Sequence, residues 1–98
     1  MITLKTVFET LKEELQATYL CTEDASATGF LLFKFQLFED LTIIVFYDLR
    51  RNEIARFEAI DDFDWDNDRA MLDCHSKLDL MVFCRDAMKS QLKSRRER

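Results

Sequence analysis

Three apolar segments in close succession constrain the fold of this chain more than any other feature. They occupy residues 30–38, 41–49 and 54–60 and are rich in aromatic and β-branched side chains, which β-strands favour. Only Glu39-Asp40 separates the first two, and a short turn around Arg51-Asn52 separates the second and third. Connections this short join antiparallel strands. The sequence therefore predicts a three-stranded antiparallel meander.

Side-chain alternation gives this meander a predicted register. Pairing Phe38 with Leu41, and Leu49 with Ile54, brings aromatic and aliphatic side chains of all three strands onto one face. That face would carry Leu31, Phe33, Phe35, Leu37, Thr42, Ile44, Phe46, Asp48, Phe57 and Ala59.

The opposite face of the predicted sheet is less polar than a solvated face should be. It would include Phe30, Leu32, Val45 and Tyr47, with few charged residues among them. Such a face is expected to be buried either by a helix of the same chain or by the surface of a partner protein. In the second case these four residues are candidate contacts of a homodimer or of a chaperone-like module with its client.

Helices are expected before and after the three strands in the sequence. Residues 3–18 carry apolar side chains at three- and four-residue steps, which indicates an amphipathic helix. Thr3 is one candidate cap, and Thr6 with Glu9 fits a capping box as the alternative. Residues 19–22 read as a short extended segment and residues 23–29 as a loop. The apolar face of this helix consists of Leu4, Val7, Phe8, Leu11 and Leu15.

The C-terminal part, from Met71 to about residue 94, is predicted to be helical. One long helix competes with two helices broken near His75-Ser76, and Ser76 followed by Asp79 is a start signal that favours the break. Residues 91–98 are basic and are expected to be a frayed helix end. The predicted fold is a single α+β domain over residues 1–98, in the order α-β-β-β-α-α.

Length and charge limit the class of protein. With 98 residues and 48% hydrophobic composition, the chain can form one domain with a modest core. The net charge is −5, but residues 1–88 carry 9 basic against 18 acidic residues, whereas residues 89–98 carry five against one. An acidic body is unsuited to direct nucleic-acid binding and suited to a basic protein partner. The chain has no apolar run of about 18 residues and no secretion signal, so we expect a cytoplasmic protein with no membrane partner.

The sequence offers little catalytic or metal-binding chemistry. Its one histidine, His75, lies beside Cys74, but the paired spacings of a zinc site are absent. One glycine cannot build a phosphate-binding loop. A calcium loop starting at Asp62 would have Asn67 where glycine is needed and Asp73 where a bidentate glutamate is needed. We therefore expect no metal, no cofactor and no enzymatic activity.

The most unusual surface chemistry is an acidic run at residues 61–68. It contains five aspartates, a tryptophan and no basic residue: Asp61, Asp62, Asp64, Trp65, Asp66 and Asp68, with Phe63 and Asn67 between them. One interpretation is a solvated loop whose last polar residues cap the following helix. The other is an acidic patch, anchored by its tryptophan, that occupies a basic groove meant for nucleic acid.

No family motif is present in the chain. Its inferred element order, small size and acidity are similar to those of some phage-encoded inhibitors, including certain anti-CRISPR proteins that imitate DNA. This resemblance implies a non-enzymatic inhibitor that binds a basic, nucleic-acid-handling protein through residues 61–68. The alternative function is a homodimeric assembly protein, or a chaperone-like binding module, that uses the apolar face of the sheet.

Overall fold

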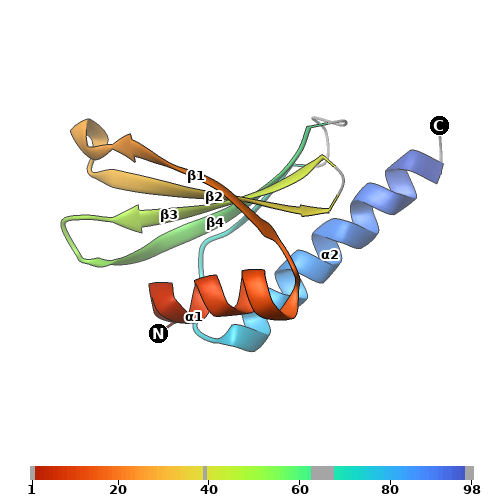
Figure 1. Cartoon of the computed structure of the whole chain (residues 1–98), viewed down its shortest axis with the longest axis horizontal. Coiled ribbons are helices and arrows are strands. Elements are labelled where there is room, and N and C mark those ends of the chain that lie inside the picture. Colours follow the sequence, from red (N-terminus) through yellow and green to blue (C-terminus); the bar gives the residue numbers. More distant parts are fainter. Residues whose placement is uncertain (1, 39, 63–67, 97–98) are drawn as a thin grey trace.

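The chain folds as an α+β structure in which an N-terminal helix and a C-terminal helix pack against a five-stranded antiparallel sheet (Figure 1). This computed structural model describes residues 2–38, 40–62 and 68–96. The predicted α+β class is confirmed, but the sheet has two more strands than the sequence indicated. None of the helices among the described residues is long and apolar enough to cross a membrane.

The N-terminal helix has the apolar face that its spacing predicts. Helix α1 (Leu4–Glu9) continues into a π-helical segment η1 (Thr10–Glu14). Thr3 caps the helix, because its side-chain oxygen accepts a hydrogen bond from the Thr6 amide at 3.2 Å. Val7 and Leu11 are completely buried. The helix is shorter than predicted, and Gln16, with φ of 55°, lies between it and the sheet.

The strands follow one another across the sheet in chain order. They are β1 (Thr18–Ala25), β2 (Phe30–Phe38), β3 (Leu41–Asp48), β4 (Glu53–Asp61) and β5 (Arg69–Met71), with a short 3₁₀ turn η2 (Ser26–Thr28) after β1. Strands β2, β3 and β4 are the predicted meander. Strand β1 extends the short segment expected at residues 19–22, and β5 lies where helix was expected.

Two irregularities go with a changed register, by one residue between β2 and β3 and by one to two residues between β3 and β4. Phe38 pairs with Leu41 as expected, but the register changes between Gln36 and Phe38, so that Phe35 pairs with Ile43. Between β3 and β4 the pairing is irregular beside Phe46 and Tyr47, and Tyr47 rather than Leu49 pairs with Ile54. Because side chains alternate along a strand, a shift of one residue exchanges the faces. The predicted face assignment of β3 is therefore wrong.

A single helix α2 (Lys77–Arg96) forms the C-terminal part. Its start agrees with the predicted signal, because the Asp79 amide donates to Ser76 Oγ at 3.2 Å and the Asp79 carboxylate accepts from the His75 amide at 3.1 Å. Met71 and Leu72, predicted to be helical, precede this helix. Met71 is the last residue of β5, and Leu72 follows that strand. The helix includes Gln91, which is 1% exposed and so is not frayed.

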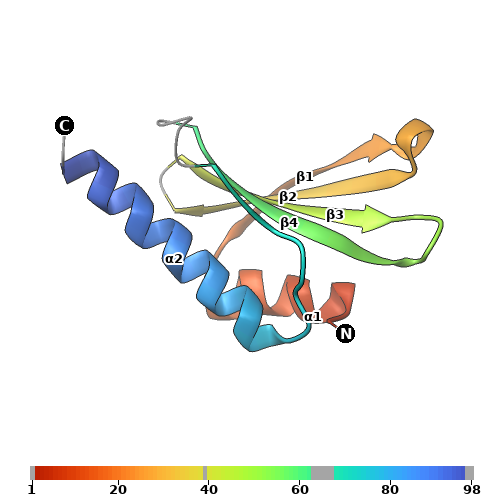
Figure 2. The ribbon, with the colours of Figure 1, turned by 180° about the vertical axis from the view of Figure 1, so that it is seen from behind.

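Both helices cover the same face of the sheet, here called the inner face (Figures 1 and 2). The Phe8 ring of α1 lies 5.0 Å from that of Phe35, centroid to centroid. Helix α2 presents one stripe to the core, which includes Leu80 and Cys84. The completely buried core residues are Val7, Leu11, Phe35, Ile43, Val45, Phe57, Ala59, Leu80 and Cys84.

Candidate protein-binding surfaces

The first residue of the acidic run, Asp61, does not lie on the surface. It ends β4, pairs with Leu41 and is 1% exposed. Its Oδ1 accepts a hydrogen bond from the Gln91 side-chain amide of α2 at 3.2 Å. A buried carboxylate needs such partners, so Asp61 joins the sheet to the helix and cannot contribute to an accessible acidic patch.

Asp62 and Asp68, in contrast, are exposed. Asp62 accepts from the Thr42 hydroxyl at 3.2 Å, and its amide donates to the Asp40 carbonyl at 2.8 Å. The Asp68 carboxylate accepts from the Asp61 amide at 3.3 Å. These bonds hold the two ends of the run together at one end of the sheet. Asp64, Trp65 and Asp66 lie outside the described residues.

The expected capping role of Asp68 is wrong, because β5 and not a helix follows it. Basic side chains lie close to this end of the sheet. Arg69 of β5 donates to Ser90 Oγ of α2, and both residues line a hollow with Lys89 and Lys93. The described residues around the acidic run therefore carry both signs of charge.

The outer face of the sheet, opposite the helices, carries an aromatic and aliphatic cluster on β2 and β3. We call Phe30, Leu32, Ile44 and Phe46 the outer-face patch. The Phe30 and Phe46 rings meet edge to face with centroids 6.2 Å apart, and Leu32 pairs with Phe46 across the strands. Ile44 is 8% exposed, and the other three are half-buried.

Charged side chains border this patch as ion pairs. Lys34 Nζ lies 3.0 Å from the Glu23 carboxylate, and Arg56 Nε lies 3.3 Å from the Glu58 carboxylate. The Arg56 guanidinium also lies over the Phe46 ring, 4.1 Å from its centroid, at cation–π distance. Each of these two cations thus has a carboxylate beside it, and the surroundings of the patch are close to neutral.

The four residues predicted to share a binding face do not do so. Phe30 and Leu32 lie on the outer face, but Val45 and Tyr47 lie on the inner face; Val45 is completely buried and pairs with Phe33 and Phe57. Ile44 and Phe46 lie on the outer face, although the predicted register placed them on the opposite one. The one available signal was the apolar pair Leu37-Phe38 at the strand end, where alternation fails and the register shifts.

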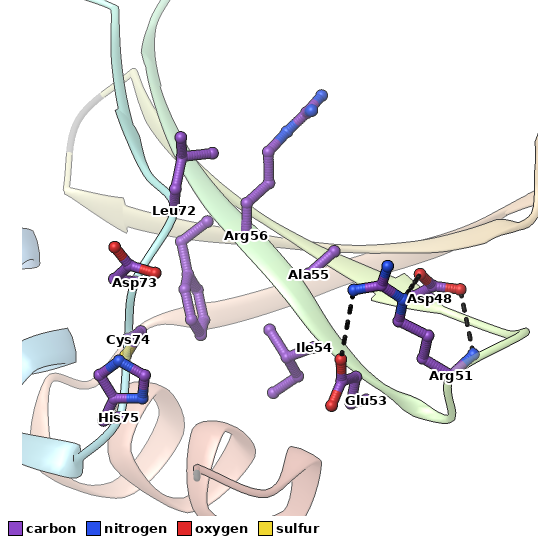
Figure 3. A pocket seen from close by; sticks show the side chains of 11 residues that line it. Asp48, Arg51, Glu53, Ile54, Ala55, Arg56, Leu72, Asp73, Cys74 and His75 are labelled. Carbon is purple, nitrogen blue, oxygen red and sulfur yellow. Dashed lines mark hydrogen bonds and ion pairs between the residues drawn. The ribbon is translucent and has the colours of Figure 1, made fainter.

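A pocket of about 260 Å³ opens between β4 and residues 72–75 (Figure 3). Ile54 and Phe57 contribute apolar side chains from β4, and Leu72 and Cys74 contribute them from the facing segment. Leu72 is 70% exposed. The Arg51 guanidinium lies 4.0 Å from both the Asp48 and the Glu53 carboxylates at one side of this pocket.

Neither thiol near this pocket is an activated nucleophile. Partial burial, with the Asp79 charge as a smaller cause, raises the pKa of the Cys74 thiol. Burial raises the pKa of the Cys84 thiol to about 12, with a smaller contribution from Cys74. Both thiols are therefore protonated at neutral pH, and the thiolate is the reactive form. Within the described ranges, no three His, Cys, Asp or Glu side chains are grouped to hold a metal ion.

No protein-family model, no curated protein and no solved structure matches this chain. Its function is inferred from its own residues.

Proposed function

We propose that the protein is a small cytoplasmic protein-binding protein, without catalytic chemistry of its own, that assembles as a homodimer through the outer-face patch. The observation that supports this proposal is the placement of both helices on the inner face (Figures 1 and 2). No described element covers the outer face. Four apolar side chains on it stay in partial contact with water, and covering them is favourable by roughly 25 cal/mol per Å² of apolar surface.

Charge favours a second copy as the occupant of this face. The chain has a net charge of −5, so two copies repel one another over most of their surfaces. Around the patch, Lys34 and Arg56 each lie beside a carboxylate, which removes most of that repulsion. In a two-fold contact both copies use the same patch, so that a residue i of one copy meets a residue j of the other and the reverse. We expect Lys34 and Arg56 of one copy to meet Glu23 and Glu58 of the other.

Light scattering on patch variants tests this proposal. The wild-type chain should have twice the mass of one chain at high micromolar concentration, and Leu32→Glu should be monomeric because two buried carboxylates would face each other. The matched control is Leu78→Glu, which places the same charge on α2 at a residue that is 67% exposed, and it should stay dimeric. A monomeric wild-type chain would contradict the proposal.

Circular dichroism should show that Leu32→Glu is folded. If it is not, Phe30→Glu at the edge of the patch replaces it in the same experiment. A folded Phe30→Glu chain that remains dimeric also contradicts an outer-face dimer.

The second candidate function is an inhibitor that binds a basic, nucleic-acid-handling protein through the acidic run. The observation in its favour is that Asp62 and Asp68 are exposed and held together, so that the run begins and ends at one place on the surface. Binding to an arginine-rich peptide, used as a substitute for the basic groove, should weaken steeply with salt. If replacing Asp62, Asp64 and Asp66 together by asparagine leaves this binding unchanged, the acidic run is not the binding surface.

A further inference from the structure

One edge of the sheet is open beside the pocket of Figure 3. Strand β4 has nine residues, but β5 has three and pairs only with Phe57, Glu58 and Ala59. On this side, residues 53–56 face no other strand of the described structure. An open strand edge offers unpaired N–H and C=O groups to an extended peptide.

The pocket occupies the place where a longer β5 would lie. Met71 pairs with Phe57 in an antiparallel register, so residues 72–75 would pair with residues 56–53 if the strand continued. Instead the chain leaves the sheet at Leu72 and turns toward the start of α2, which Ser76 caps. Residues 72–75 thereby become the far wall of a pocket of about 260 Å³ whose near wall is the open edge of β4.

The lining of this pocket offers apolar side chains and one available charge. Ile54 is partly exposed on one side of β4 and Leu72 projects to the other side, beside Arg56 (Figure 3), whereas Phe57 is completely buried. The exposed Asp73 carboxylate makes no hydrogen bond or ion pair with any other described residue. Arg51 is engaged by Asp48 and Glu53, whereas Arg56 is engaged by Glu58 and Phe46. The charge left for a ligand is therefore negative.

We propose that this pocket binds a short extended peptide that carries an apolar side chain next to a lysine or arginine. The peptide adds to β4 along residues 53–56, with its apolar side chain against Ile54 and its cation near Asp73. Ala55 is the extra residue of a bulge between β3 and β4. Bulges are common next to binding sites and discourage long strand pairing, so the edge suits a segment of a few residues.

Amide hydrogen exchange with a defined peptide tests the inference. The probe is an acetylated, amidated hexapeptide of alternating lysine and valine, and its matched control alternates glutamate and valine. The lysine peptide should slow exchange of those amides of residues 53–56 that point away from β3, because strand addition occupies them. The glutamate peptide should bind about fivefold more weakly or worse, since its charge is repelled by Asp73.

Variants separate this site from the rest of the surface. Asp73→Asn should weaken binding of the lysine peptide about threefold, while the exposed Glu13→Gln should have no effect. Leu32→Glu, which tests the outer-face dimer, should bind the peptide as the wild type does. Equal affinity for both peptides, unchanged exchange at residues 53–56, or wild-type binding by Asp73→Asn would overturn the inference.

Discussion

At the scale of single residues, Asp61 shows how one carboxylate leaves an acidic run and becomes part of the core. Its neighbours Asp62 and Asp68 are exposed, as an acidic surface run suggests. Asp61 is buried because it is the last residue of β4 and its side chain turns toward Gln91 of α2. Nothing in the run itself distinguishes Asp61 from Asp62, because the distinction depends on a helix that begins 16 residues later.

We predict that Asp61→Ala destabilises the protein far more than Asp62→Ala. The first change removes the buried hydrogen bond that the Gln91 side-chain amide donates to Asp61, which should lower the free energy of unfolding by about 2 kcal/mol. The second removes an exposed hydrogen bond to Thr42 and should cost less than about 1 kcal/mol. Urea unfolding at one fixed protein concentration measures the free energy of unfolding of both variants. Equal decreases in the two variants would show that the Asp61–Gln91 hydrogen bond does not stabilise the fold.

The Cys84 thiol predicts how stability depends on alkaline pH. Its pKa rises from an ordinary value of 9.0 to about 12 on folding, so between these values the folded chain keeps a proton that the unfolded chain has lost. The free energy of unfolding should therefore fall as pH rises, with a contribution of about 1.4 kcal/mol per pH unit from this thiol.

The matched variant for this measurement is Cys84→Ala, studied with a reductant present. Subtracting the variant's free energy of unfolding from that of the wild type at each pH removes the contribution of the titratable groups that both chains share. The wild-type chain should lose stability more steeply than the variant above pH 9.0. Parallel profiles would mean that burial does not hold the proton on Cys84.

At the scale of elements, sequence patterns predict the strands well and their partners less well. The bounds of β2 agree with the prediction at both ends, and those of β3 and β4 agree to within one residue. Strand β5 was missed because Arg69, Ala70 and Met71 are good helix formers, and pairing with β4 overrides that preference. The bulge after Gln36 was also missed, since an extra residue in a strand changes the pairing without changing the composition.

Helix α2 gives a prediction about which of its faces is buried. Leu80 is completely buried, whereas Leu78, two residues earlier, is 67% exposed. Leu80→Ala should lower the free energy of unfolding by about 3 kcal/mol through loss of packing, and Leu78→Ala should change it by less than about 0.5 kcal/mol. Chemical denaturation of both variants tests the orientation of the helix, and the reverse order would require a rotated helix.

At the scale of the whole molecule, the arrangement of layers determines which surfaces can bind a partner. The sequence raised two possibilities for the second face of the sheet, a helix or a protein. Both helices pack on the inner face, around Phe35 and Phe57. This arrangement could not be derived from periodicity, because each helix has one apolar face and either side of the sheet could receive it.

The outer face thus carries apolar residues that no described element of the chain covers. The sequence left open whether a helix or a protein covers this face, and two of the four residues predicted there, Val45 and Tyr47, lie on the other side. Ile44 and Phe46 take their places.

Sedimentation equilibrium of the wild-type chain at low and high salt tests the central claim most directly. Apolar association depends little on ionic strength, whereas binding through carboxylates is screened by salt. The account predicts a mass of two chains at high micromolar concentration in both buffers. A mass of one chain in both, or a dimer that dissociates as salt is added, would contradict an assembly through the outer-face patch.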